Sequence, residues 1–184
     1  MTLLLILFIV LATIGAFDVG YYHILKLRLF ERPECNHEQL AHTCRGLLFC
    51  GMLALVAFGA PRGGFALALL VLFAIDTVNT IVDTFVEQDS RASLGGLERG
   101  EYMTHVIGSV CIGAAAMYAV ITLWPHLSTT SEFSAYSGLA EQLAIGVQAL
   151  LALTAAVVAL ELALHIRARM RAARTEVAYY LFRR

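Results

Sequence analysis

The chain has 184 residues, of which 59% are hydrophobic and only 15% carry a charge, and its mean hydropathy is +0.74. A soluble domain of this length carries more charge, so the composition predicts an integral membrane protein with a single domain, residues 1–184, in a lipid bilayer. The formal net charge is −1 and the sequence offers no basic face, which excludes a nucleic-acid-binding protein.

Apolar segments long enough to cross a bilayer occur five times along the chain. The hydrocarbon core of a bilayer is about 30 Å thick, and an α-helix crosses it with about 20 residues. Glycine and proline residues mark the connections between these segments. The fold class predicted is therefore an all-α integral membrane protein with five transmembrane helices. The expected helices cover residues 3–28, 39–60, 64–87, 101–124 and 138–166.

Lysine and arginine residues are distributed unevenly among the connections. The first connection, the third connection and the C-terminal tail hold 12 of the 13, the second connection has only Arg62, and the fourth has none. By the positive-inside rule, the N-terminus is outside and the C-terminus is cytoplasmic, as in a bacterial inner-membrane protein. The tail, residues 167–184, mixes arginine with aromatic residues, which predicts an interfacial segment against anionic headgroups.

A stripe of polar residues runs along the third expected helix, within the segment 74–87. At about 100° per residue, Asp76, Thr80, Asp83 and Glu87 fall within one narrow sector. Carboxylates are costly in hydrocarbon, so this stripe is expected to face the interior of a helix bundle and to meet partners there.

A carboxylate and an imidazole one turn apart recur at the start of two expected helices, as Glu38-x-x-x-His42 and Glu101-x-x-x-His105. By depth, these pairs, His23 and Asp83 lie near the cytoplasmic boundary, and Asp18 and Asp76 lie about two turns deeper. Four of the five helices are therefore expected to form a bundle around a polar layer on the cytoplasmic side. A third pair, Glu161 and His165, lies beside the arginine-rich tail, where the spacing also fits helix-end electrostatics.

This polar layer favours a metal site, because carboxylates and imidazoles from several helices also build the di-iron and di-manganese sites of soluble four-helix bundles. Those proteins use Glu-x-x-His, so the likeness is one of physical logic. Donors without thiolate suit iron, manganese or zinc, and we favour a di-metal site of iron or manganese. On an α-helix Asp18 and His23 point about 140° apart, so only one of them is expected to reach a given centre. The candidate ligands are His23, Glu38, His42, Asp76, Asp83, Glu101 and His105, with Asn79, Thr80, Tyr22 and Tyr102 as hydrogen-bond donors behind them.

A metal pair beside the hydrocarbon boundary favours an oxidoreductase that hydroxylates or desaturates a lipid-soluble substrate. The first alternative is an electron-transfer subunit with His42 and His105 as axial ligands of haem b. The second is a proton or cation transporter. The third is an accessory subunit of an oligomer or larger membrane complex, in which each polar pair is a local contact, for example Arg45 with Asp83 or Glu38. The sequence alone does not decide whether the protein is an enzyme.

Overall fold

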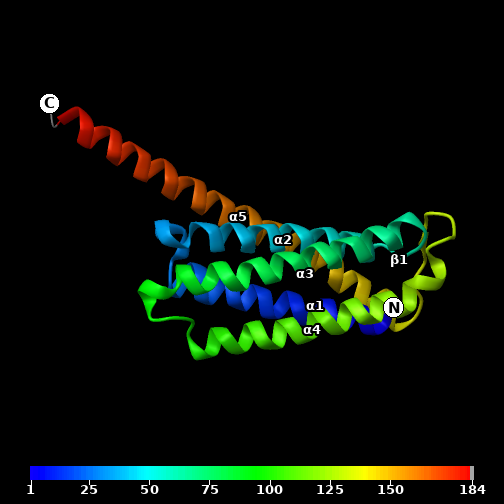
Figure 1. The fold of residues 1–184 in the computed structure, drawn as a ribbon. Helices are drawn as coiled ribbons and strands as arrows, with labels where there is room; N and C mark the ends of the chain where they lie inside the picture. The colour runs from blue at the N-terminus through cyan, green and yellow to red at the C-terminus, as the bar shows by residue number, and fades with distance from the viewer. Residues whose placement is uncertain (183–184) are drawn as a thin grey trace.

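The computed structural model describes the backbone of residues 1–182 and the side chains of residues 1–172. It is a bundle of five helices that are long and apolar enough to cross a membrane, which confirms that part of the predicted fold class (Figure 1). Its placement in a bilayer remains a prediction. The helices are α1 (Thr2–Phe17), which continues as the π-helix η1 (Asp18–Lys26), α2 (Asn36–Ala57), α3 (Gly64–Ser90), α4 (Arg99–Leu123) and α5 (Leu139–Phe182).

The fifth helix differs most from its predicted bounds, because it continues without a break to Phe182 and not only to residue 166. After Gly146 the helix contains no glycine or proline, and alanine, leucine, arginine and glutamate are strong helix formers. Figure 1 shows α5 extending beyond the other four helices. The side chains of residues 173–184 lie outside the described residues, so the contact with headgroups predicted for this tail stays a prediction.

The helices surround a common interior and leave one weak seam. Helix α2 packs between α3 and α5, and α1 packs between α4 and α5, whereas α3 and α4 contact each other much less. The sequence prediction placed four helices around the polar layer. In the structure α5 also faces the interior, where Val158 and Glu161 are buried.

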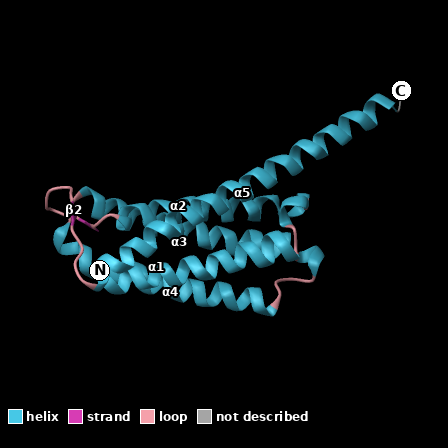
Figure 2. Cartoon of the chain, turned by 180° about the vertical axis from the view of Figure 1, so that it is seen from behind, coloured by secondary structure: helices cyan, strands magenta, loops and turns pink. Residues whose placement is uncertain are grey.

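The connections gather at the two ends of the bundle (Figure 2). At one end, which we call the hairpin end, β1 (Ala60–Pro61) pairs antiparallel with β2 (Phe133–Ser134), and η5 (Trp124–His126) follows α4. Gly63 is required there, because its φ is +54° and a Cβ atom would lie 2.5 Å from the carbonyl oxygen of Thr129. The other end, which we call the site end, holds η1, the 3-10 turns η2 (Leu29–Glu31), η3 (Pro33–Cys35) and η4 (Ala92–Leu94), and the starts of α2 and α4.

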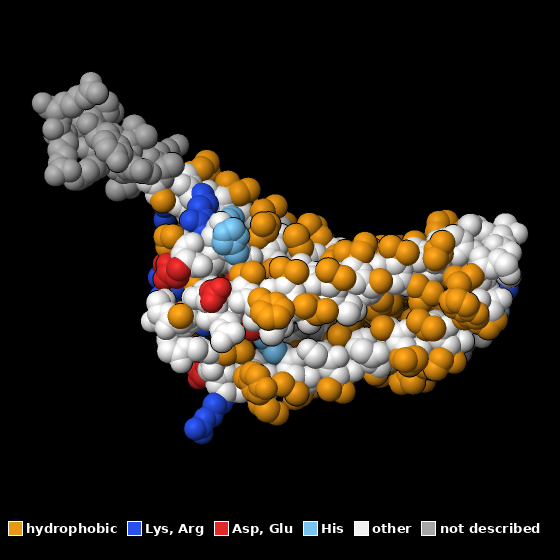
Figure 3. Space-filling view, in the orientation of Figure 1, with side chains coloured by type: hydrophobic (Ala, Val, Ile, Leu, Met, Phe, Trp, Pro, Cys, Tyr) orange, Lys and Arg blue, Asp and Glu red, His pale blue; other side chains and the backbone are white. Residues whose placement is uncertain are grey.

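The half of the bundle next to the hairpin end has an apolar core. Phe8 of α1 is fully buried, stacks on Phe73 of α3 with ring centroids 5.9 Å apart, and meets the edge of Phe49 of α2 at 5.7 Å. The outer face is apolar as well (Figure 3), and Val110 and Ile121 of α4 are 67% and 66% exposed. A helix bundle that is apolar on both its inner and outer faces is suited to lipid and not to water.

Candidate metal centre

The π-helix η1 sets the geometry of the site at the end of α1. In a π-helix the hydrogen bonds run from residue i to i+5, so residues five apart stack much as i and i+4 do in an α-helix. Asp18 and His23 therefore point the same way, and His23 Nε2 lies 3.6 Å from Asp18 Oδ2. The expectation that only one of them reaches a common centre is wrong, because it assumed α-helical geometry.

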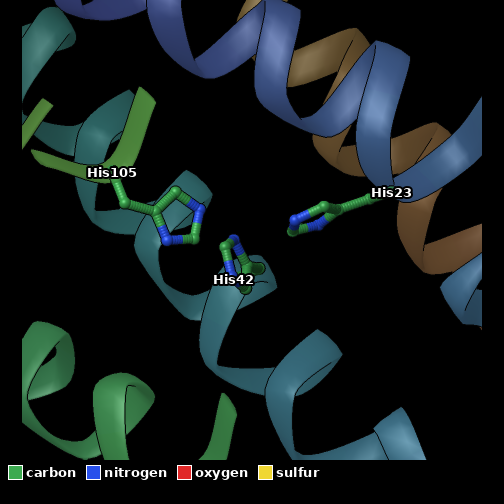
Figure 4. Close-up of side chains that lie close together, drawn as sticks. All are labelled: His23, His42 and His105. Atoms are coloured by element: carbon green, nitrogen blue, oxygen red, sulfur yellow. The ribbon is translucent and has the colours of Figure 1, made fainter. Parts of the chain in front are cut away.

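Three imidazoles converge from three different segments (Figure 4). His23 comes from η1, His42 from α2 and His105 from α4, and their rings point toward one another. The ring centroids of His23 and His42 are 4.3 Å apart and those of His42 and His105 are 6.0 Å apart. One nitrogen from each ring lies within 4.8 Å of the other two. Two ligands on opposite sides of an ion at about 2.1 Å are about 4 Å apart, so this spacing needs only small movements to close on a metal.

Two further groups contain carboxylates as well as imidazoles, and the ligand atoms within each group also lie within 4.8 Å of one another. Each group contains carboxylate and imidazole donors, the donor set that suits iron, manganese or zinc. The first group is Asp18, His23, Glu101 and His105, and the second is Glu38, His42 and Glu87. The two groups share no residue.

His105 links the two groups. Its Nε2 atom lies 3.2 Å from Asp18 Oδ2, and its Nδ1 atom lies 3.4 Å from Glu87 Oε1. One ring therefore faces a carboxylate of each group with a different nitrogen. The two groups are therefore adjacent, with the His105 ring in contact with a carboxylate of each.

The structure brings together five of the seven predicted ligands, namely His23, Glu38, His42, Glu101 and His105. Asp76 and Asp83 belong to no such group among the residues with described side chains. Asp76 Oδ1 lies 3.8 Å from Arg45 Nε. Asp83 Oδ2 lies 3.4 Å from Arg45 Nη1, the local contact anticipated from the sequence, and 3.4 Å from His42 Nε2.

The donors expected behind the ligands are also placed differently. The Asn79 amide donates to the backbone carbonyl of Ala41. The Thr80 hydroxyl accepts a hydrogen bond from Arg45 and donates one to the backbone carbonyl of Asp76. Tyr102 is 57% exposed. Thr104 supports the site instead, because its hydroxyl donates to Asp18 Oδ1 at 2.9 Å. The Tyr22 ring contacts its aromatic neighbours Phe17 and Tyr21 and lies under the ammonium group of Lys26.

A buried arginine holds two of the carboxylates. Arg91, just after α3, is 1% exposed, and its Nη2 atom donates to Glu101 Oε1 at 2.6 Å and lies 2.7 Å from Glu38 Oε1. Ser90 donates a further hydrogen bond to Glu38. Burial lowers the pKa of the Arg91 guanidinium, but the hydrogen bond and charge of Glu38 and the charge of Glu101 outweigh it, so the pKa is raised and Arg91 stays charged.

The sequence does not identify Arg91 as part of the site, because this residue follows the helix and stands out only as a positive charge of the third connection. The contact anticipated between Arg45 and Glu38 is replaced by the contact between Arg91 and Glu38. Glu87 carried a usable signal, since it lies on the same stripe as Asp83, whereas Asp18 was hidden by the π-helix.

Several polar atoms in this cluster are buried without a hydrogen-bond partner. They are both ring nitrogens of His23, Nε2 of His42, Oε1 of Glu87 and Oε2 of Glu101. Buried polar atoms in native proteins are nearly always satisfied, and each exception requires an explanation. One nitrogen of each imidazole and the carboxylate oxygens have lone pairs that a bound cation would accept, so the residues fit a metal.

A cavity of about 400 Å³ reaches the cluster and is lined by residues from all five helices. Most of its other lining residues are apolar, and its polar end is formed by Asp18, His42, Arg45, Asp76, Asp83, Glu87 and His105. Thr84 of α3 and Ser109 of α4 line the cavity and are also exposed, so it opens at the weak seam between these helices. Figure 3 shows a cleft along this seam with a histidine side chain visible inside it.

No protein-family model, no curated protein and no solved structure matches this chain. The side-chain geometry is therefore the basis for the function proposed next.

Proposed function

We propose that this protein is a membrane-embedded metal-binding protein that holds two divalent transition-metal ions at the site end. The observation that carries the proposal is the convergence of His23, His42 and His105, of which the first two are buried and the third is half-buried, with one nitrogen of each ring within 4.8 Å of the others. Two ions are favoured over one because the two groups of carboxylate and imidazole donors share no residue.

Charge supports the same conclusion. Asp18, Glu38, Glu87 and Glu101 lie together at the site end, and Arg91 is the guanidinium that the structure shows in contact with two of them. Uncompensated charge in a low-dielectric interior is strongly unfavourable, so the excess negative charge requires cations or protonated imidazoles. Metal ions would supply that charge and would bind a ring nitrogen of His23, whose Nε2 atom lies beside the carboxylates of Asp18 and Glu101.

Iron or manganese is the metal class we favour, because the donors are imidazoles and carboxylates without thiolate. Bound there, such a metal would supply one-electron chemistry with dioxygen, which suits hydroxylation or desaturation of a lipid-soluble substrate. In this chain the carboxylates and imidazoles hold the ions, Arg91 and Thr104 orient carboxylates, and the cavity brings substrate to the polar end. The electrons that such reactions consume would come from a reductant outside this chain. We also propose that the site end lies near the cytoplasmic side of the membrane.

Elemental analysis of the detergent-solubilised protein, with an absorption spectrum of the same sample, tests the proposal. About two equivalents of iron or manganese without a Soret band are expected, and His42→Ala and His105→Ala should each lose most of the metal. His126→Ala is the matched control, because His126 lies in η5 at the hairpin end, and it should retain the metal. A Soret band would replace the proposal with haem b, and equal metal content in all variants would remove the assigned site.

A further inference from the structure

The cavity changes character along its length. Its walls away from the cluster include Leu11 and Ala12 of α1, Gly108 and Ile112 of α4, and Leu150 of α5. A Cβ atom at Gly108 would meet only the Ile14 side chain, at 3.8 Å, so the glycine leaves space at this wall. A cavity of this size, mostly apolar with a few convergent polar groups, has the form of a small-molecule site.

A buried carboxylate of α5 lines the same cavity but belongs to neither metal group. Glu161 is 2% exposed, and its Oε1 atom has no hydrogen-bond partner. On the α2 side, Gln39 Oε1 lies 3.0 Å from Nδ1 of His165, which is one helical turn after Glu161. The unpartnered carboxyl oxygen of Glu161 is therefore left for an occupant of the cavity.

The two helices that flank the mouth of the cavity are apolar on their outer faces. Val78 and Phe85 of α3 are 61% and 69% exposed, and Val106 and Val110 of α4 are 39% and 67% exposed. These side chains lie within helices long and apolar enough to cross a membrane. A mouth in this position opens sideways into hydrocarbon, so it admits molecules dissolved in lipid.

We infer that the cavity binds a lipid-soluble molecule with a hydroxyl-bearing head and an apolar chain. The hydroxyl donates to the free oxygen of Glu161, which places the head beside the cluster, and the chain lies against α1, α4 and α5. An alcohol or phenol meets both requirements, since it donates one hydrogen bond and is otherwise apolar. The inference deepens the proposed function by naming its substrate class, and it rests on that function for the reaction but not for the binding.

Photolabelling of the full-length protein in lipid nanodiscs tests the inference. The probe is a long-chain alcohol with a diazirine on its chain, and the comparison probe is the matching alkane without the hydroxyl. We expect the alcohol to label cavity-lining peptides of α1, α4 and α5, and Gly108→Leu to abolish that label by filling the cavity. Gly113→Leu is the matched control, because Gly113 lies on the same helix, is exposed and does not line the cavity, and it should leave the label unchanged.

The role of Glu161 is tested by the preference for alcohol over alkane. Glu161→Leu should remove the preference, and Glu161→Gln should retain part of it because an amide oxygen still accepts a hydrogen bond. Labelling spread evenly over exposed residues, or the same in wild type and Gly108→Leu, would overturn the inference. Metal content measured on the same samples separates the two proposals. Protein that is labelled but holds no metal would support the cavity site and contradict the metal centre. Protein that holds metal but is not labelled would support the metal centre and contradict the cavity site.

Discussion

The two ends of the bundle treat buried polar groups in opposite ways. At the hairpin end, side chains satisfy backbone groups: the Tyr136 hydroxyl donates to the carbonyl of Val56 at 3.0 Å, and the Gln148 amide donates to the carbonyl of Ala57 at 2.9 Å. These are among the last carbonyls of α2, which have no partner within their own helix. The hairpin end therefore uses polar groups to close the fold.

At the site end, by contrast, some buried polar atoms have no hydrogen-bond partner. Both nitrogens of His23 and one carboxyl oxygen of Glu87 are buried without hydrogen-bond partners. Proteins depart from full hydrogen-bond satisfaction mainly at functional sites, where stability is given up for binding or chemistry. The contrast teaches that the apolar half holds the bundle together, whereas the site end is arranged for something it binds.

Removing the buried guanidinium should have the largest effect on stability. In Arg91→Met, Glu38 and Glu101 lose their shared cation in the protein interior, and breaking a buried ion pair in this way costs about 3–5 kcal/mol. Reversible unfolding in mixed micelles measures the loss. The triple variant Arg91→Met, Glu38→Gln, Glu101→Gln should recover most of it, and an unrecovered loss would mean that Arg91 acts through packing and not through charge.

A core substitution at the other half should separate stability from metal binding. Phe8→Ala removes a fully buried ring that contacts Phe49 and Phe73, and such cavities cost about 3 kcal/mol or more. The metal content of the folded fraction should match wild type. Loss of metal at unchanged protein recovery would contradict the division between the two ends.

Added metal should stabilise the site end in a pH-dependent way. An ion at 100 times its Kd stabilises the folded state by about 2.7 kcal/mol. Protons compete for the imidazole nitrogens, so the stabilisation should be present at about pH 8 and fall steadily toward about pH 5. Thermal unfolding with and without iron or manganese measures the effect. His42→Ala should show no metal-induced shift at either pH, and a shift of wild-type size in that variant would place the metal elsewhere.

The number and approximate position of the helices could be predicted from the sequence because bilayer thickness fixes how many apolar residues a span needs. The two Glu-x-x-x-His pairs were equally accessible, since one helical turn brings both side chains to one face. The joint position of Asp18 and His23 could not be predicted in this way. The hydrogen-bond register of η1 decides it, and a π-helix carries no periodicity that distinguishes it from the apolar α-helix before it.

The sequence also does not indicate which cation each carboxylate contacts. Arg45 and Arg91 are both near the polar layer in sequence, and only the packing of η4 and the start of α4 decides that Arg91 meets Glu38 and Glu101. Glu161 has the same spacing to His165, but its position beside the arginine-rich tail also fits helix-end electrostatics. Its burial follows from α5 packing between α1 and α2, an arrangement that the hydrophobic pattern of α5 does not specify.

The smallest effect we predict has the opposite sign from the others. His23 is 1% exposed with two unpartnered nitrogens, and replacing a buried unsatisfied polar group by an apolar one of similar size removes a desolvation penalty of about 1–3 kcal/mol. His23→Phe should therefore raise the unfolding free energy of the metal-stripped protein by about 1 kcal/mol, after the cost of imperfect packing. The same variant should bind less metal and lose the metal-induced stabilisation. Unfolding of chelator-treated wild type and variant, side by side, measures both. A variant less stable than metal-free wild type would show that His23 already has partners without an ion, and the contrast between the two ends would then not hold at His23.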